Sequence, residues 1–410
     1  MTPVGQTLTR RPASRSAPSP VLPMPVRLLA LLSFLLSVVI PQIAAAQPAP
    51  PTIEARSWLL LDETTGQVLA SHDADRKIEP ASLTKIMTAY LAFEALRDGR
   101  ITADQRPAVS PAAYKAIGSR MFVEPARPAS VDELLHGVII QSGNDASIIL
   151  AEALAGTEEV FAGQMNQAAQ RMGLTNTHFS NATGLPDPQH YSTARDLAIL
   201  AQRMIEDFPD RFPLYSAREY TWNNIRQLNR NRLLAIDPSV DGMKTGHTEA
   251  AGYCLIATAR RDVPGLDRQR RLISVVLGAS SESARAMESQ KLLNYGYQNF
   301  EVVRVLARDE PTGSYEVWKG SAATVDGSVG QSVLVTVPRG QAGQVKAEIE
   351  RIEPLIAPIE KGQRIGTLRV RIGDEAVTEL PLHAMTAVAP ASWPGRLWDS
   401  LRLMFSRGAK

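Results

Sequence analysis

The chain has 410 residues, of which 44% are hydrophobic and 21% are charged, a composition typical of a globular protein with a sizeable core. Its formal net charge is +2 at pH 7, and residues 1–46 hold four arginines and no acidic residue, so the remainder carries −2. A chain so close to neutral argues against a nucleic-acid partner, which needs a basic face.

Residues 1–46 have the organisation of a secretory signal peptide. Arg27 precedes an apolar run from Leu28 to Ile40, and small residues at positions 44–46 predict cleavage after Ala46. The apolar run is short for a membrane-spanning helix. Export permits disulfides, but Cys254 is the single cysteine, so no internal disulfide can form. Its apolar surroundings, "AGYCLIATA", predict a buried core thiol rather than a reactive one.

Residues 47–300 are predicted to form the catalytic domain, with strands at both ends and helices between them. The pattern predicts a hairpin over 56–72, a helix with Ser82 as N-cap and Gly99 as its end, and a helical stretch over 131–155 that is interrupted at "QSGND". Further helices are expected at 158–173, 193–208 and 283–300, and apolar strands at 252–261 and 270–279. This order predicts an α+β fold, an antiparallel sheet flanked by helices.

The pattern changes after residue 300. Alternating apolar and polar residues with Gly and Asp turns predict a small all-β stalk domain over 301–389. Residues 390–410 place Leu397, Trp398, Leu401, Met404 and Phe405 on one face of a helix, with basic residues elsewhere. That profile is typical of an amphipathic helix lying in a membrane surface, and we expect membrane contact here. A terminal helix packed on the β-domain is the alternative.

A serine and a lysine stand three residues apart in "EPASLTKIMTAY", at the predicted start of a helix. Positions i and i+3 share a helix face, so Lys85 can reach the hydroxyl of Ser82. A serine nucleophile needs a base, and lysine acts as one only if burial and neighbouring positive charge lower its pKa. Taken alone, the motif leaves open whether Lys85 is a base or a solvated surface lysine.

Two further motifs favour the base. "VIIQSGNDAS" places Ser142 and Asn144 on a polar kink in an apolar helical stretch. "VDGMKTGHTEAAGYCLI" places Lys244, Thr245 and Gly246 at the head of an apolar strand, against which a substrate backbone can lie as an added strand. Ser-x-x-Lys, Ser-x-Asn and Lys-Thr-Gly, in this order, are the signature set of class A β-lactamases and penicillin-binding proteins.

With these motifs, and with segments such as "GLTNTHF", "YSTARD", "LISVVLG" and "VTVPRGQ", the chain resembles the low-molecular-mass penicillin-binding proteins, which are serine D-alanyl-D-alanine carboxypeptidases. The resemblance covers nearly the whole chain after residue 46. It implies a hydrolase that removes the terminal D-alanine from peptidoglycan pentapeptide stems without a cofactor and is acylated by β-lactam antibiotics. It also implies a location on the periplasmic side of the bacterial cytoplasmic membrane.

The resemblance implies a role for each catalytic residue. Ser82 is the nucleophile and Lys85 its general base. Ser142 relays a proton to the leaving D-alanine, and Asn144 holds the substrate amide. Lys244 tunes Ser142 and Lys85 electrostatically.

It also implies the binding groups. The backbone N–H groups of Ser82 and His247 form the oxyanion hole, and Gly246 gives the substrate room beside the strand. Thr245, Arg285 and Arg230 lie near the free carboxylate of the substrate, although Arg230 fits an internal ion pair equally well. His190, in "DPQHYSTARD", belongs to a loop that borders the pocket in relatives.

Alternative functions are an endopeptidase of the same chemistry, a β-lactamase and a non-enzymatic wall-binding protein. A β-lactamase needs a glutamate that activates water, and no Glu occurs between Val160 and Ile205. An inactive wall-binding protein would have lost one of the catalytic side chains, and all are present. The endopeptidase is not separated from the carboxypeptidase by sequence. Six histidines without metal-ligand spacing predict no metal site.

Overall fold

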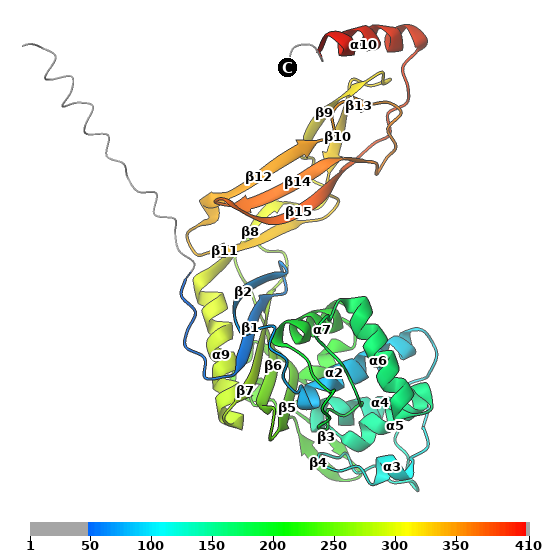
Figure 1. Cartoon of the computed structure of the whole chain (residues 1–410), viewed down its shortest axis with the longest axis vertical. Helices are drawn as coiled ribbons and strands as arrows, with labels where there is room; N and C mark the ends of the chain where they lie inside the picture. The colour runs from blue at the N-terminus through cyan, green and yellow to red at the C-terminus, as the bar shows by residue number, and fades with distance from the viewer. Residues whose placement is uncertain (1–47, 407–410) are drawn as a thin grey trace, which may run out of the picture. The chain divides into compact units, whose positions relative to one another are not determined.

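The computed structural model describes residues 48–406, so the predicted signal peptide, residues 1–46, lies outside the described residues. Residues 57–279 supply a five-stranded antiparallel sheet in the order β2-β1-β7-β6-β5 (Figure 1). Its strands are β1 (Ser57–Asp62), β2 (Gln67–His72), β5 (Val240–Thr248), β6 (Gly252–Arg261) and β7 (Arg270–Ala279). The predicted hairpin and the two apolar strands are confirmed. β5 forms one edge of the sheet, so half of its backbone groups are not used by the sheet.

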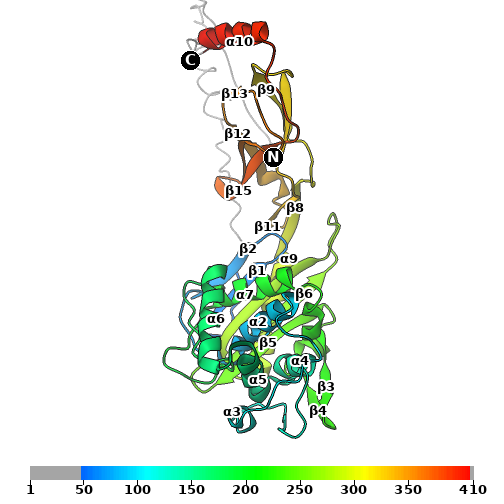
Figure 2. The same cartoon turned by 90° about the vertical axis from the view of Figure 1, so that its right-hand side faces the viewer.

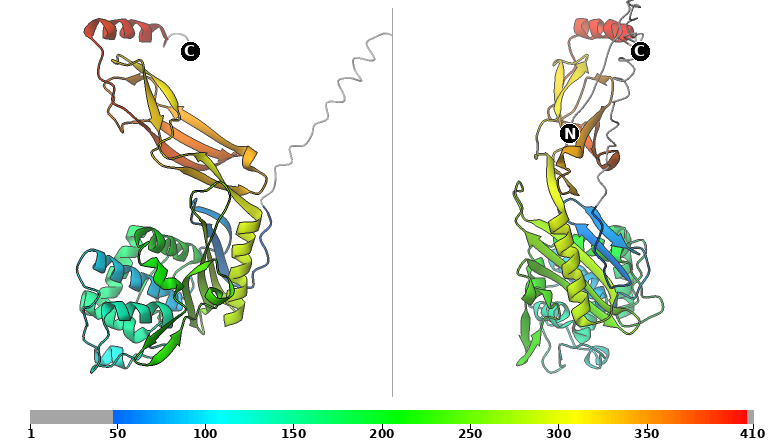
Figure 3. Two further views of the ribbon diagram at one scale, coloured as in Figure 1. Left: turned by 180° about the vertical axis from the view of Figure 1, so that it is seen from behind. Right: turned by 90° about the vertical axis from the view of Figure 1, so that its left-hand side faces the viewer.

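Helices cover both faces of this sheet, which is why β6 and β7 each have a continuous run of buried, mostly apolar residues. α9 (Glu282–Asn299) lies along one face (Figure 3) and packs with Leu60, Leu272 and Val276. α2 (Lys85–Arg97) and α7 (Ala194–Asp207) belong to the larger core on the other face (Figure 2). That region also contains α3 (Pro111–Tyr114), α4 (Val131–His136), α5 (Asn144–Ala155), α6 (Glu158–Met172), β3 (Glu219–Trp222) and β4 (Ile225–Leu228). The short helix α8 (Leu233–Ile236) instead packs with the core on the α9 side through Leu233 and Leu234.

The segment around Ser82 differs from the prediction. Ala81–Thr84 form a 3₁₀ turn and α2 begins at Lys85, so Ser82 is not the N-cap of the helix. The predicted N-cap was wrong because the turn aims the Ser82 hydroxyl at the Lys85 amine and not at a backbone N–H. The interruption predicted at "QSGND" is confirmed: a π-helical turn over Gly137–Gln141 is followed by Ser142 in the left-handed conformation, with φ 66°.

All-β structure follows α9 directly, as predicted. A six-stranded sheet has the order β12-β14-β15-β10-β9-β13, and β11 pairs with β8 alone. The strands are β8 (Phe300–Leu306), β9 (Gly313–Trp318), β10 (Thr324–Ser328), β11 (Val333–Pro338), β12 (Val345–Arg351), β13 (Leu355–Ile356), β14 (Arg364–Ile372) and β15 (Glu375–Ala384). Valine, isoleucine and leucine side chains of these strands form two small cores.

The predicted terminal helix is present as α10 (Trp393–Ser406). It touches the β-domain through polar groups, because the Asp399 carboxylate accepts a hydrogen bond from the Lys319 N–H at 2.7 Å. Its large apolar side chains are solvent-exposed, and Trp393, Trp398 and Met404 are 71%, 64% and 69% exposed. No helix within residues 48–406 is both long enough and apolar enough to cross a membrane.

Candidate active site

The first element of the site is the amine of Lys85, which is buried at the start of α2. Its Nζ lies 3.0 Å from the hydroxyl of Ser82, 2.7 Å from Oδ1 of Asn144 and 2.5 Å from the carbonyl oxygen of Thr183. The Asn144 and Thr183 oxygens can only accept hydrogen bonds, whereas the serine hydroxyl can donate or accept. A neutral amine donates its two hydrogens to the two obligate acceptors, which leaves its lone pair facing the proton of Ser82.

The environment of Lys85 favours this neutral form. Burial lowers the pKa of Lys85 to about 7, and the Arg230 guanidinium adds to the effect, while the charges of Asp145 and Glu158 act in the opposite direction. Burial likewise holds the pKa of Lys244 well below its ordinary value, with the charges of Lys85 and Arg230 acting in the same direction. Burial therefore lowers the pKa of Lys85 as expected, and the neighbouring positive charge that adds to this effect is that of Arg230 and not that of Lys244.

A buried carboxylate holds Ser142 and Asn144 in place where the π-helical turn meets the start of α5. Asp145 accepts hydrogen bonds from the N–H groups of Met121, Phe122 and Val123 at 2.7–3.1 Å. This contact fastens the 117–123 segment over the kink, and the Asn144 side chain donates to the carbonyl of Ile117 at 2.6 Å. The hydroxyl of Ser142 is buried and has no hydrogen-bond partner among residues 48–406, so it is free for a ligand.

A second loop, around residues 181–184, packs against the 81–84 turn. The Asn181 side chain accepts from the N–H groups of Thr183 and Gly184, which shapes the loop, and Glu158 accepts from the Ala182 N–H at 2.9 Å. Gly184 has φ +79°, and a Cβ at this position would lie 1.8 Å from the carbonyl oxygen of Ala81. Only glycine fits there, because it combines a left-handed backbone with a close approach to another backbone.

These parts surround a cavity of about 240 Å³. Eight of the ten predicted site residues line it: Ser82, Ser142, Asn144, Arg230, Thr245, Gly246, His247 and Arg285. The other two, Lys85 and Lys244, are buried behind the wall, 1% and 3% exposed. The structure therefore brings together residues that are up to about two hundred positions apart in the sequence.

The cavity wall carries positive charge. Arg230 donates to the Ser119 hydroxyl at 2.8 Å, and among the described residues it has no carboxylate partner, which removes the internal ion pair as an alternative. Arg285 donates to the carbonyl of Gly246 at 3.2 Å and lies 3.5 Å from Glu282 at the rim. Two guanidinium groups with at most one nearby carboxylate suit a ligand that carries a carboxylate.

The histidines have different environments. The His247 ring is exposed and stacks on Tyr253 with centroids 4.1 Å apart, so its contribution to the cavity wall comes with the backbone of β5. His190 is buried outside the cavity. Its Nδ1 accepts from the Ser180 N–H at 3.1 Å, which leaves Nε2 as donor to Thr84 at 2.7 Å. Burial lowers the pKa of His190 to about 4, so the ring is neutral and supports the residue before Lys85.

The serine–lysine pair, the serine–asparagine loop and the Lys-Thr-Gly strand around one cavity agree with what known proteins show. The D-alanyl-D-alanine carboxypeptidase family model matches residues 43–281, and the model for the C-terminal domain of penicillin-binding protein 5 matches residues 300–390. The chain belongs to the D-alanyl-D-alanine carboxypeptidase family. It is therefore a hydrolase of the serine peptidase class, and the predicted family and fold are confirmed.

Relatives within the family cover most of the chain. D-alanyl-D-alanine carboxypeptidase DacC of Escherichia coli (strain K12) is 43% identical over 364 residues, 87% of this chain and 89% of the relative. DacA of the same strain is 37% identical over 367 residues, with the same two shares. The crystal structure of penicillin-binding protein 5 from Haemophilus influenzae has a TM-score of 0.78 at 37% identity and covers 83% of this chain and 99% of its own.

Several residues that line the cavity were not among the predicted site residues. Thr183, Gly184, Thr248 and Ser119 line the cavity but belong to none of the three motifs. A signal was available for Gly184, since a Thr-Gly pair between two helices predicts a turn, but not for its contact with Ala81. Cys254 is the buried core thiol that was expected, and burial raises the pKa of this thiol to about 11.

Proposed function

We propose that this chain removes the terminal D-alanine of peptidoglycan pentapeptide stems through an acyl-enzyme on Ser82. The neutral amine of Lys85 takes the hydroxyl proton as Ser82 Oγ attacks the carbonyl carbon of the D-Ala-D-Ala bond. The N–H groups of Ser82 and His247 stabilise the oxyanion of the tetrahedral intermediate. The observation that carries this proposal is the pairing of the Lys85 amine with Ser82 and with two obligate acceptors.

Collapse of the intermediate needs a proton on the leaving nitrogen. Ser142, whose buried hydroxyl has no partner within residues 48–406, passes the proton from the Lys85 ammonium to that nitrogen. The Arg230 guanidinium, whose charge lowers the pKa of Lys85, opposes retention of the proton on that amine. Water then attacks the acyl carbonyl, Lys85 accepts its proton, and Ser82 is released.

The cavity supports recognition of a C-terminal carboxylate. Arg285 and Arg230, together with the hydroxyl of Thr245, receive the carboxylate of the leaving D-alanine. Asn144 holds the substrate amide, for which its side chain has to exchange one of its present contacts with Lys85 and Ile117. The substrate backbone lies along β5 as an added strand, beside Gly246, where a side chain would meet Pro80 and Ala81.

β-Lactam antibiotics acylate Ser82 in the same way, because their strained amide presents its carbonyl to the same nucleophile. The structures of penicillin-binding protein D2 from Listeria monocytogenes include an ampicillin-bound form, at 29% identity over 60% of this chain. No glutamate is present between residues 160 and 205 to activate water, and Glu158, just outside this window, is held by Ala182. The acyl-enzyme formed with a β-lactam is therefore expected to persist longer than that of a class A β-lactamase, in which a glutamate activates water.

Mass spectrometry of a synthetic pentapeptide incubated with the protein tests the activity. Loss of one D-alanine, abolished by Ser82→Ala, is the expected result. Splitting of a cross-linked peptide dimer without loss of D-alanine would instead favour the endopeptidase, and no cleavage of either would contradict both.

We further propose that α10 holds the protein on the periplasmic face of the bacterial cytoplasmic membrane. The exposed Trp398, Leu401 and Met404 supply the apolar contact. Arg396, Arg402, Arg407 and Lys410 against Asp399 give residues 393–410 a net charge of +3, attractive to anionic lipid. The protein should sediment with anionic vesicles, and a chain truncated after Ala389 should stay in solution with unchanged activity on small peptides. Equal sedimentation of both would overturn the anchor.

A further inference from the structure

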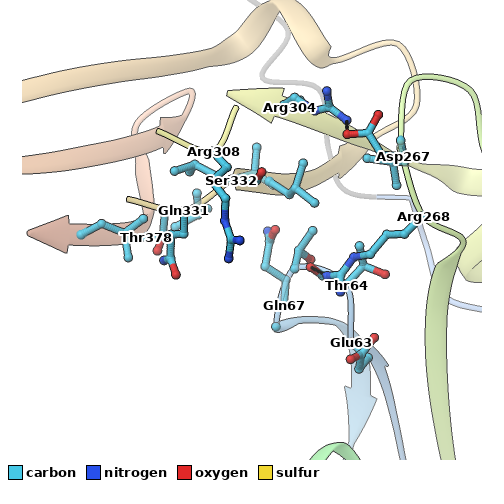
Figure 4. A pocket seen from close by; sticks show the side chains of 18 of the residues that line it. Glu63, Thr64, Gln67, Asp267, Arg268, Arg304, Arg308, Gln331, Ser332 and Thr378 are labelled. Carbon is cyan, nitrogen blue, oxygen red and sulfur yellow. Dashed lines mark hydrogen bonds and ion pairs between the residues drawn. The ribbon is translucent and has the colours of Figure 1, made fainter. Parts of the chain in front are cut away.

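A second and larger cavity, of about 830 Å³, lies away from Ser82, where the β1–β2 hairpin meets β11 (Figure 4). It has the size of a small-molecule site. Its walls are polar and apolar in about equal measure, and their polar part consists of amide, hydroxyl, carboxylate and guanidinium side chains from both the catalytic domain and the β-domain.

On one side of this cavity, the Gln67 side chain bonds to the edge of β11 as a neighbouring strand would. The Gln67 amide accepts a hydrogen bond from the N–H of Thr336 at 2.5 Å and donates one to the carbonyl of the same residue at 3.1 Å. An added β-strand would make the same pair of bonds. The Thr336 hydroxyl also donates to buried Asp62 at 2.7 Å, so this end of β11 is fixed against the catalytic domain.

The next position along the same edge is open. β11 pairs with β8 on its other side, in continuous register from Leu334 to Pro338. Backbone groups two residues apart point to the same edge of a strand, so the N–H and C=O of Leu334 face outward as those of Thr336 do. Leu334 lines the cavity, and β11 has no second partner strand among residues 48–406.

Charged groups of both signs face the same space. Arg308 extends into the cavity from the β-domain (Figure 4), and within residues 48–406 its guanidinium has no hydrogen-bond or ion-pair partner. Glu63 enters from the catalytic domain, half-buried, and burial raises the pKa of its carboxyl group. The other two arginines are already engaged, Arg304 with Asp267 at 2.6 Å and Arg268 with the Thr64 carbonyl at 3.2 Å.

We propose that this cavity is a second, non-catalytic site for short zwitterionic peptides of the peptidoglycan-stem class. The peptide backbone pairs with Leu334, its carboxylate binds Arg308, and its ammonium group lies near Glu63. This inference rests on the proposed function, because stem peptides are the molecules that the reaction consumes and releases.

The cavity favours a short peptide over a strand of another protein. Gln67 closes the edge at Thr336, and the β11–β8 register is broken between Val333 and Leu334, so only a short stretch of edge is free. An open cavity with separated charges of opposite sign also suits a small zwitterion better than an apolar strand. Binding here would hold a wall peptide on the protein while the catalytic cavity works on another.

The test uses the protein acylated with penicillin, which occupies Ser82 and is verified by mass. Calorimetric titration with L-Ala-γ-D-Glu-L-Lys-D-Ala should show one bound peptide. Arg308→Glu should weaken this binding at least tenfold, and Leu334→Pro, which removes the outward N–H, should weaken it as well. Lys346→Glu makes the same charge change at an exposed residue of β12 outside the cavity and should leave affinity unchanged.

No heat from the acylated protein, or equal affinities for Arg308→Glu and Lys346→Glu, would overturn the second site. Both glutamate variants should hydrolyse a small D-Ala-D-Ala substrate at the rate of the unmodified protein. A protein that binds the peptide through Arg308 but never acquires penicillin would instead overturn the proposed function and keep the peptide site.

Discussion

The carboxylate of Glu79 accepts a hydrogen bond of 2.9 Å from the hydroxyl of Thr248, which itself accepts one from the N–H of Ala251. Glu79 lies three residues before Ser82, and Thr248 directly follows His247. The bond therefore ties the nucleophile turn to β5 and fixes the spacing of the two N–H groups proposed for the oxyanion hole.

We expect Thr248→Val to lower the rate constant of penicillin acylation about tenfold, less than the loss of an oxyanion donor itself, which lowers rates by about 10²–10³. Thr248→Ser keeps the hydroxyl and should restore most of the rate. The pH midpoint of the reaction should not move, because the variant leaves Lys85 untouched. An acylation rate unchanged in Thr248→Val would show that the bond is not needed.

Acylation should rise with pH around the pKa of Lys85. The base acts in its neutral form, and burial sets its pKa at about 7, so the reactive fraction grows as pH increases through this value and then levels off. Lys85→Arg should abolish acylation, since a guanidinium stays protonated. Stopped-flow acylation between about pH 5 and pH 9 measures the profile.

His190→Gln serves as the control for this profile. It removes a buried hydrogen bond and should lower the free energy of unfolding by about 1–3 kcal/mol. Because burial holds the pKa of His190 near 4, the ring does not titrate in this range and the midpoint should stay at its wild-type value. A flat wild-type profile, or a midpoint that moved in His190→Gln, would contradict the assignment of Lys85 as the titrating base.

Gly184→Ala should be far more harmful than Gly156→Ala. Both glycines have positive φ, +79° and +83°, so an alanine at either position carries a backbone penalty of about 1–2 kcal/mol. Only at Gly184 would the added Cβ collide with the backbone of Ala81, beside the nucleophile. Thermal unfolding should separate the two variants, and penicillin acylation should survive only in Gly156→Ala; equal effects would contradict the close approach.

Leu401→Glu should weaken binding to anionic vesicles roughly tenfold or more, because burial of a large apolar side chain contributes about 1.5–3 kcal/mol when complete. Ser400→Glu makes the same change of charge on the neighbouring, less exposed position. Its effect on vesicle binding should be smaller, because this variant adds a negative charge without removing a large apolar side chain. Matching losses for the two variants in a sedimentation assay would mean that α10 binds through charge and not through its apolar face.

The helices and strands could be predicted from the sequence where a short pattern of apolar and turn residues determines them. The hairpin around Gly66, the strands β6 and β7, and helices α6 and α7 follow from apolar periodicity and turn residues, and Thr193 caps α7 as its sequence position indicates. Ser82 was wrongly predicted to be an N-cap, because serine is common at helix N-caps and also occurs as a nucleophile. The hydroxyl faces the Lys85 amine, which no local pattern reveals.

The sequence motifs predicted which side chains form the candidate site. They did not predict the backbone contacts around Lys85 or the charges that lower its pKa. Ser82, Ser142 and Lys244 each belong to a recognisable segment, whereas Thr183 and Gly184 act through backbone contacts with a turn about a hundred residues away. The effect of Arg230 on Lys85 likewise depends on tertiary distance, so the sequence argument assigned that effect to Lys244. Contacts of this kind follow only from the folded chain.

Peptide mapping after incubation with penicillin identifies the residue that is acylated. We expect a single modified residue, Ser82, and an adduct that disappears in Ser82→Ala while the thermal unfolding of that variant stays cooperative. The adduct should form with a rate that increases through about pH 7. An adduct on another residue, or labelling that survives in folded Ser82→Ala, would contradict the assignment of Ser82 as the nucleophile that Lys85 activates.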